Sequence, residues 1–229
     1  MTNELKREFD RYKPWITKFT IQGQDYGGAY DAAGDPRVKW FHQHFPEAHN
    51  ILELGSLEGG HSFALASLPH VTRVVAVEGR KDNLRRAQFV QGVLAQPKVS
   101  FVHENLERFN LSTLGEFDVV VCLGLLYHLP EPWKLVEQMS RVARAIYLWT
   151  HYADAKRAKT VRQHYQGCVY REWYFLFEAL SGLSATSFWP TREGLLQMLA
   201  DYGFADVAVV DDTPSHQHGP AITLVARRR

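Results

Sequence analysis

A carboxylate and a run of glycines stand at the end of a short apolar segment in the first third of the chain. The first segment, Asn50–Leu54, contains Glu53 and runs into Gly55-Ser56-Leu57-Glu58-Gly59-Gly60. Gly55 and Gly59 remove side chains where a ligand could approach the backbone closely. A helix beginning near Gly59 would direct its free N–H groups at that ligand. The pattern predicts a strand, a glycine turn and a helix that together hold a nucleotide.

The spacing and charge of this segment indicate which kind of nucleotide it suits. A dinucleotide fingerprint reads G-x-G-x-x-G, but here Leu57 occupies the middle position. Glu53 lies two residues before the first glycine, where it would repel a pyrophosphate and attract a cationic or amine-bearing ligand. The alternative is an ordinary strand–turn–helix with a solvated glutamate, because short glycine motifs recur by accident.

The E-x-G-x-x-x-G pattern resembles motif I of the class I S-adenosylmethionine-dependent methyltransferases. The resemblance implies that Glu53 reaches the methionine part of the cofactor, and that Gly55, Ser56 and Gly59 let the cofactor lie against the loop. A second apolar segment, 73–77, ends in Glu78. In this family an acidic residue at that place accepts hydrogen bonds from the ribose hydroxyls, for which a carboxylate has enough lone pairs.

Two later segments continue the resemblance. Segment 99–103 leads to Asn105 and Leu106. The family usually has Asp at the first of these positions, on the adenine amino group; an Asn oxygen can accept the same bond, and Leu106 would offer its backbone N–H. Segment 117–122 runs into Leu123-Gly124-Leu125-Leu126-Tyr127-His128, which resembles motif IV, whose strand end faces the transferred methyl group. Leu123 is therefore assigned to the cofactor site.

Candidate catalytic residues follow from the chemistry that the resemblance implies. Methyl transfer is an in-line displacement, so the protein mainly aligns the acceptor and excludes water. A hydroxyl or amine acceptor can also need a base. His128 is the first candidate and His151 the second, because imidazole changes its charge near neutral pH; Tyr127 could orient the acceptor or the cofactor. The alternative for His128 is a helix-start residue bonded to backbone.

The elements that must position these residues alternate between strands and helices. This alternation predicts an α/β fold with helices on both faces of a mostly parallel, seven-stranded sheet, whose last strand is antiparallel. The length suits a single domain, 1–229. Within it we expect a cofactor-binding half at 50–149, and a C-terminal helix and hairpin at 190–229.

Two further parts lie outside the nucleotide-binding pattern: an N-terminal cap or lid at 1–49 and an insertion on the substrate side at 150–189. In this family such additions form the acceptor pocket. The loop Tyr26-Gly27-Gly28-Ala29-Tyr30 suits an aromatic flap over a sulfonium, or equally a glycine turn with core aromatics. The insertion is rich in aromatic and basic residues, among them Trp173, Tyr174, Phe175 and Phe177. The predicted acceptor contacts are Tyr26, Tyr30, Trp149, Arg171 and Trp189.

Composition limits the remaining classes of function. The net charge of +1 shows no general attraction to nucleic acid, and two cysteines make no disulfide framework. No apolar run approaches the length of a membrane span, and the polar N-terminus lacks a signal-peptide core, so we expect a cytoplasmic protein. The pair His216 and His218 lacks further ligands, so we expect no metal.

The sequence therefore predicts transfer of a methyl group from S-adenosylmethionine to a hydroxyl, amine or carbon of a small molecule, releasing S-adenosylhomocysteine; a homodimer is possible. Two alternatives stay open. The segment 124–128, with Pro132 downstream, also resembles bacterial tRNA wobble-uridine carboxymethyltransferases. However, an enzyme that binds tRNA is expected to have a markedly basic surface, which this chain's net charge does not indicate. The other alternative is an inactive, cofactor-binding or interaction protein of this fold. A nicotinamide dehydrogenase is disfavoured by Leu57 and the terminal hairpin.

Overall fold

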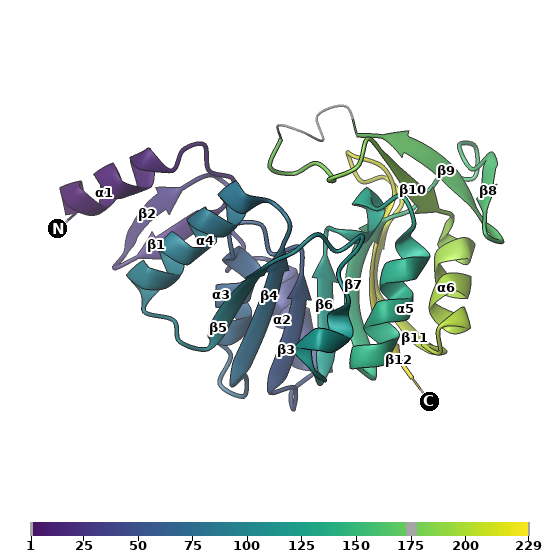
Figure 1. Ribbon diagram of the computed structural model, residues 1–229, viewed down its shortest axis with the longest axis horizontal. Coiled ribbons are helices and arrows are strands. Elements are labelled where there is room, and N and C mark those ends of the chain that lie inside the picture. Colours follow the sequence, from purple (N-terminus) through teal and green to yellow (C-terminus); the bar gives the residue numbers. More distant parts are fainter. Residues whose placement is uncertain (1, 173–177, 229) are drawn as a thin grey trace.

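The computed structural model describes residues 2–172 and 178–228. A seven-stranded sheet with the order β11-β12-β7-β6-β3-β4-β5 forms its centre (Figure 1). Five strands pair in parallel, and β12 is antiparallel to both of its neighbours. This confirms the predicted sheet. The strands are β3 (Asn50–Leu54), β4 (Arg73–Glu78), β5 (Val99–His103), β6 (Val119–Leu123), β7 (Ala145–His151), β11 (Asp206–Thr213) and β12 (Ala221–Arg227).

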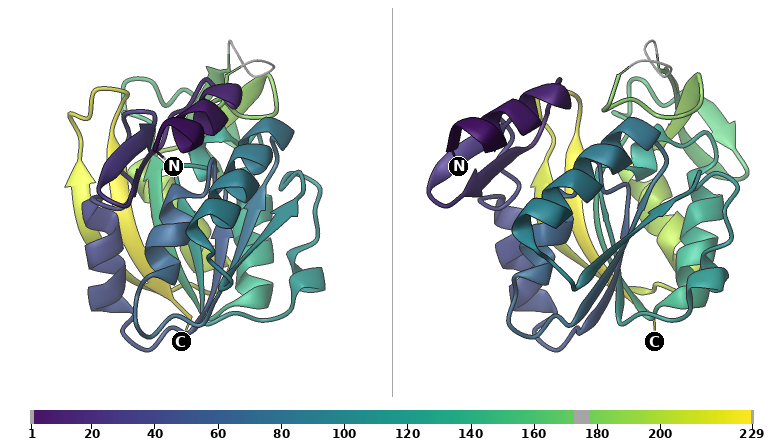
Figure 2. Two further views of the ribbon diagram at one scale, coloured as in Figure 1. Left: turned by 90° about the vertical axis from the view of Figure 1, so that its left-hand side faces the viewer. Right: turned by 60° about the vertical axis from the view of Figure 1, so that its left-hand side comes forward.

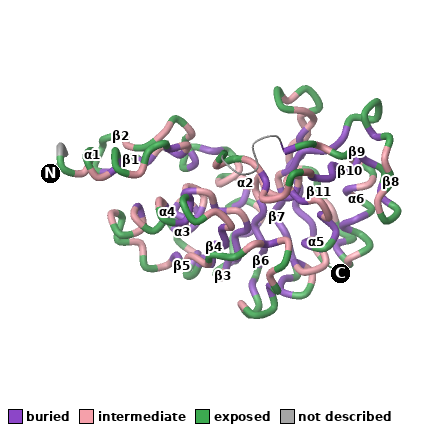
Figure 3. Tube along the Cα trace, turned by 45° about the horizontal axis from the view of Figure 1, so that its top comes forward, coloured by how far each residue is buried: buried purple, intermediate pink, exposed green. Residues whose placement is uncertain are grey.

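The central strands are apolar throughout because helices cover both faces of the sheet. Alternate residues point to opposite faces: Ile51 belongs to one core cluster, whereas Leu52 and Leu54 belong to the other. Figure 2 shows the sheet between its two helical layers, and Figure 3 shows the buried residues running along the central strands. One layer holds α2 (Pro36–His44), α3 (Gly60–Ala66) and α4 (Lys81–Leu94); the other holds η1 (Leu111–Leu114), α5 (Pro132–Val142) and α6 (Arg192–Asp201).

The helices begin where their local sequence satisfies free backbone N–H groups. Asp35 accepts a hydrogen bond from the backbone N–H of Arg37 (2.8 Å) and so caps α2. Thr191 does the same for α6 through the N–H of Gly194 (3.0 Å). Pro132 stands at the first position of α5, where its missing N–H costs nothing.

The N-terminal part forms α1 (Thr2–Arg11) and a hairpin of β1 (Lys18–Ile21) and β2 (Gln24–Gly27), which lie beside α4 (Figure 1). Aromatic rings join them, since the Phe9 and Phe89 centroids are 5.1 Å apart.

The chain between α1 and β1 is bonded to the glycine loop by Glu58, which is fully buried. Its carboxylate accepts from the backbone N–H groups of Ile16 (3.1 Å) and Thr17 (2.6 Å).

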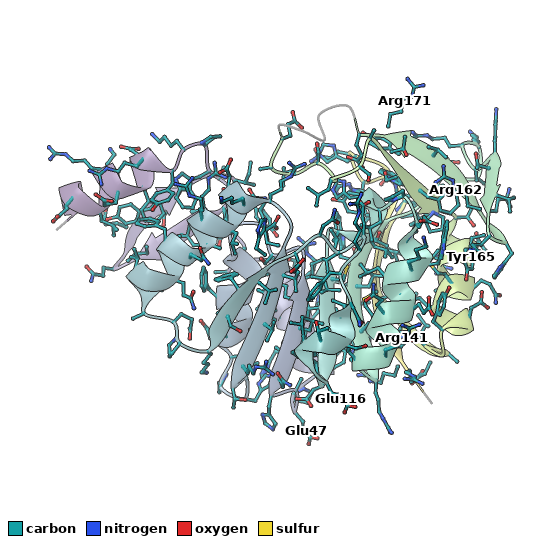
Figure 4. All side chains as sticks on the ribbon, viewed as in Figure 1. Glu47, Glu116, Arg141, Arg162, Tyr165 and Arg171 are labelled. Carbon is teal, nitrogen blue, oxygen red and sulfur yellow. The ribbon has the colours of Figure 1, made fainter. Side chains whose placement is uncertain are left out.

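Glu58→Ala should destabilise the protein by about 2 kcal/mol, because buried backbone N–H groups lose their acceptor. Urea unfolding, followed by the midpoint at an unchanged m-value, measures the effect. The matched control is Glu47→Ala, which removes an exposed carboxylate at the opposite end of the sheet (Figure 4). Equal midpoints for the two variants would contradict the role of Glu58 as an anchor.

The insertion after β7 folds into a small antiparallel sheet with the order β10-β9-β8. Its strands are β8 (Thr160–Arg162), β9 (Tyr165–Arg171) and β10 (Thr186–Pro190). The backbone N–H of Phe188 donates to the carbonyl of Leu129 (2.9 Å), so β10 is attached to the loop that follows β6. The aromatic residues Trp173, Tyr174, Phe175 and Phe177 lie outside the described residues. Within residues 2–172 and 178–228, no helix has the length and apolar character needed to cross a membrane.

Candidate active site

A cavity of about 450 Å³ lies at the carboxyl ends of the parallel strands, where open α/β sheets bind their ligands. Its floor comes from the loops after β3, β4, β5 and β6. Its walls come from the N-terminal part, from the loop between β11 and β12, and from the segment 178–184, which we call the covering segment. Residues from the two parts outside the nucleotide-binding pattern thus reach the same cavity as residues from the cofactor-binding half.

The glycine loop is shaped by close packing. Gly55 has φ +76°, and a Cβ on it would lie 3.0 Å from the Cβ of Leu125. Gly59 has φ +81° and precedes α3; a Cβ there would lie 2.9 Å from the ring of Phe101. Gly55 and Ser56 line the cavity, whereas Gly59 shapes the turn from behind. The buried Ser56 hydroxyl makes no hydrogen bond within the part of the chain that the structure describes.

The two predicted carboxylates occupy different places. Glu78 lines the cavity, and its carboxylate accepts from the backbone N–H groups of Leu57 (2.8 Å) and Arg80 (2.7 Å). Burial raises the pKa of Glu78, against the effect of these bonds. Glu53 is buried behind the loop, where it accepts from the Ser62 hydroxyl, and it is not among the residues that line the cavity.

The loops after β5 and β6 place Asn105, Leu106 and Leu123 on the cavity wall. The Asn105 side-chain oxygen accepts from the backbone N–H of Glu107 (2.9 Å), which fixes the turn. An amide oxygen has two lone pairs, so this bond leaves Asn105 able to accept another.

The covering segment lies over the loop that follows β4. The guanidinium of Arg80 donates from Nη2 to the carbonyls of Ser181 (3.0 Å) and Gly182 (2.8 Å). A Cβ on Gly79 would lie 2.6 Å from a leucine side chain of this segment. The covering segment is therefore bonded to residues next to Glu78, and it forms the cavity wall at this end.

His128 ends the short helix η2 (Leu126–His128) on the cavity wall and is paired with a carboxylate from the insertion. Its Nδ1 lies 3.0 Å from Oε1 of Glu172. The same oxygen accepts from the Ser187 hydroxyl (2.9 Å), and Oε2 of Glu172 accepts from the Gly182 N–H (3.3 Å). Burial acts to raise the pKa of Glu172, but these hydrogen bonds outweigh it and hold the pKa below its ordinary value.

An ionised Glu172 favours the imidazole tautomer with its proton on Nδ1, so the basic nitrogen is Nε2. The Nε2 of His128 makes no hydrogen bond within the described residues. Glu172 was not predicted from the sequence. His128 and Glu172 are 44 positions apart. The weak alternation of β9 in the sequence does not indicate that the residue after this strand reaches the loop after β6.

Aromatic rings form the cavity wall next to His128. Tyr127 and Trp149 line the cavity with centroids 5.8 Å apart. His151 and Trp189 are buried behind them and stack on each other, with centroids 5.0 Å apart. Burial lowers the pKa of His151, which keeps the ring neutral. His151 and Trp189 therefore support the wall rather than line it.

A second polar cluster comes from the N-terminal part and α3: Tyr30, Asp35, Arg37 and His61. Asp35 is buried and accepts from the Arg37 guanidinium, from Nε at 2.9 Å and Nη2 at 2.5 Å, and from the Tyr30 hydroxyl. His61 Nε2 lies 3.0 Å from the Tyr30 oxygen and 3.2 Å from Asp35. Of the four, only Tyr30 was predicted from the sequence, because the others meet through folding rather than through sequence spacing.

Two predicted acceptor contacts lie elsewhere. The Tyr26 ring stacks on Phe9 (5.0 Å between centroids) in the N-terminal aromatic cluster, because its strand turns that face toward α1. Arg171 is exposed at the end of β9 and points away from the sheet (Figure 4). By contrast His216, which was not among the predicted acceptor contacts, lines the cavity, and its ring centroid is 5.9 Å from that of Trp149. Among the described residues no cluster of three or more His, Cys, Asp or Glu could hold a metal ion.

Comparisons with known proteins agree with this geometry. Residues 52–145 match a family model described as a methyltransferase domain. A ubiquinone biosynthesis O-methyltransferase of Aromatoleum aromaticum is 30% identical over 95 residues, which are 41% of this chain and 39% of that protein. A crystal structure of the N-terminal domain of EvdMO1, in the presence of S-adenosylhomocysteine (SAH) and D-fucose, is 35% identical with a TM-score of 0.90. That match covers 100% of this chain and 97% of the domain.

The fold, the cavity at the strand ends and these matches define one class of protein. The chain belongs to the class I S-adenosylmethionine-dependent methyltransferases, and its cofactor is S-adenosylmethionine. The chain spans 48% of the chain in a crystal structure of EvdMO1, to which it is 33% identical with a TM-score of 0.80. The alignment thus corresponds to about half of that protein and to less than half of the curated relative.

Proposed function

We propose that the protein transfers the methyl group of S-adenosylmethionine to a hydroxyl of a small, sugar-like ring. The observation that carries this proposal is the His128–Glu172 pair (3.0 Å) on the cavity wall at the end of β6. A hydroxyl must lose its proton as it attacks a methyl group, and a carboxylate-oriented imidazole suits that task. The related EvdMO1 domain, crystallised in the presence of D-fucose, supports a sugar-like acceptor.

The residues of the cavity fit the cofactor. The glycine loop at Gly55 leaves room that a side chain would fill, and the buried Ser56 hydroxyl has hydrogen-bonding capacity to spare. We assign Glu78 to the ribose hydroxyls, Asn105 and Leu106 to the adenine, and Leu123 to the methionine side of the site. When bound, the cofactor supplies an electrophilic methyl group on a sulfonium.

The protein side chains then perform the remaining tasks. Tyr127 and Trp149 hold the acceptor ring against an apolar wall, and the covering segment excludes water. Nε2 of His128 would take the proton that the acceptor hydroxyl loses when its oxygen bonds to the methyl carbon and the carbon–sulfur bond breaks, which releases SAH. The ionised Glu172 stabilises the imidazolium that forms and keeps the ring oriented.

Glu78→Ala should weaken SAH binding by roughly 1–3 kcal/mol, because charge-assisted hydrogen bonds to the ribose are lost. Isothermal titration calorimetry measures the affinity. Glu104→Ala is the matched control, since this exposed carboxylate also borders the cavity, so a general effect of charge would weaken both variants equally. An unchanged affinity in Glu78→Ala would move the ribose site elsewhere.

The acceptor class can be tested without prior choice of a molecule. The protein is incubated with methyl-labelled S-adenosylmethionine and either a small-metabolite fraction or a tRNA fraction. We expect label in the small molecules, attached to oxygen. Label in tRNA would support the RNA-modifying alternative, and SAH binding without labelled product in either fraction would support an inactive member of the family.

A further inference from the structure

We propose that the cluster of Tyr30, Asp35, Arg37 and His61, which we call the Asp35 cluster, selects uncharged, hydroxylated acceptors over anionic ones. This inference deepens the proposed function and rests on it. The four side chains come from two separate parts of the chain, and three of them, Tyr30, Arg37 and His61, line the cavity.

The charge of Arg37 is cancelled inside the cavity wall. Its guanidinium carbon lies 4.8 Å from the ring centroid of Trp149, on the aromatic wall where an acceptor ring would rest. A guanidinium alone in that place would bind a carboxylate or phosphate through its paired donors. Here Asp35 already occupies that pair, through Nε (2.9 Å to Oδ1) and Nη2 (2.5 Å to Oδ2).

The Tyr30 hydroxyl and the His61 ring remain as hydrogen-bonding partners for an acceptor. The Tyr30 hydroxyl lies 2.8 Å from Arg37 Nη2 and 3.0 Å from His61 Nε2. Burial raises the pKa of Tyr30, so its hydroxyl stays protonated. An anionic acceptor would meet the buried carboxylate of Asp35, which already pairs with the guanidinium of Arg37, whereas a hydroxyl of a sugar could both donate and accept.

The Asp35 cluster also lies on the far side of the acceptor wall from the base. Arg37 packs on Trp149, Trp149 meets Tyr127 (5.8 Å between centroids), and Tyr127 meets His128 (4.2 Å). A small ring lying on Tyr127 and Trp149 can therefore present one hydroxyl to His128 while the opposite edge contacts the cluster. The chemical group on that edge of the ring therefore determines whether the acceptor binds.

A matched pair of sugars tests this selection. D-fucose and D-galacturonate share the same ring and hydroxyl configuration, and they differ in a methyl group against a carboxylate. Asp35→Asn keeps the helix cap, because Asn caps as well as Asp, but it leaves the Arg37 charge uncompensated. Binding of both sugars to the SAH-saturated protein is measured by calorimetry, and their methylation is measured separately.

We expect the native protein to prefer D-fucose, and Asp35→Asn to shift the affinity ratio toward D-galacturonate by roughly tenfold, the effect of one charge-assisted hydrogen bond. Glu47→Gln, the same change at an exposed residue far from the cavity, should leave the ratio unchanged. Arg37→Gln makes the opposite change, so the preference for D-fucose should widen. This second variant also keeps the test decisive if Asp35→Asn does not fold.

The inference is overturned if the native protein binds D-galacturonate as well as D-fucose, or binds neither, or if neither variant moves the ratio. Methylation of D-fucose would then still support the proposed function. Conversely, selective binding that shifts as expected in the variants, without any methyl transfer, would support the selection by the Asp35 cluster and contradict the proposed catalysis.

Discussion

His128→Ala should lower kcat for methyl transfer by about 10²- to 10⁴-fold, the usual contribution of a positioned general base. The affinity for SAH should stay nearly unchanged, because His128 is assigned to the acceptor and not to the cofactor. Glu172→Gln should give a smaller loss of kcat, since the amide keeps a hydrogen bond to the imidazole but cannot stabilise its positive charge. Steady-state kinetics together with calorimetry separate these effects.

The control for this prediction is a second histidine–carboxylate pair. His164 Nε2 lies 2.6 Å from Asp201 Oδ2 at the protein surface, among residues that do not line the cavity. His164→Ala should leave kcat unchanged. Full activity of His128→Ala would remove His128 from the mechanism, and the proton would then have to leave to water or to another group on the cavity wall.

Gly55→Val should abolish measurable SAH binding, with an affinity loss of more than about 100-fold, or roughly 3 kcal/mol. Three physical effects combine there. The backbone has φ +76°, a region that favours glycine, and the new Cβ would lie 3.0 Å from the Cβ of Leu125. The isopropyl group would also fill the place where the cofactor lies against the loop. Calorimetry with SAH measures the loss.

Gly23→Val separates backbone strain from the blocked cavity. Gly23 has the same φ, +76°, but a Cβ on it would meet no atom within 4 Å. It lies in the turn between β1 and β2, away from the cavity. Both variants should unfold at lower denaturant concentration, but Gly23→Val should bind SAH normally. Equal binding by both variants would contradict the cradle at Gly55.

The central sheet could be predicted because its strands carry a strong local signal. Segments such as Asn50–Leu54 and Ala145–His151 are apolar on both faces, which is typical of parallel strands between two helical layers. Polar residues that end such strands, such as Glu78 and Asn105, must meet at one edge of the sheet. Their positions in the cavity therefore followed from topology alone.

The residues that the sequence did not reveal are those that act through distant partners. Glu172 is defined by its contact with His128, and Asp35 by its contacts with Arg37 and His61. No local periodicity in the sequence predicts such pairs, because each depends on how the N-terminal part or the insertion packs on the sheet. Tyr26 is the reverse case, because an aromatic beside glycines suited a flap and a core position equally, and only the fold shows that its ring packs on α1.

The central claim is that this methyltransferase acts on a hydroxyl of a neutral sugar-like ring. The most direct test incubates the protein with trideuteromethyl-labelled S-adenosylmethionine and a panel of neutral hexoses and 6-deoxyhexoses, including D-fucose, and locates the label by mass spectrometry and NMR. We predict a trideuteromethyl ether on one ring hydroxyl, lost in His128→Ala. Absence of any labelled sugar from a protein that binds SAH, or label on nitrogen or carbon of another acceptor, would contradict the claim.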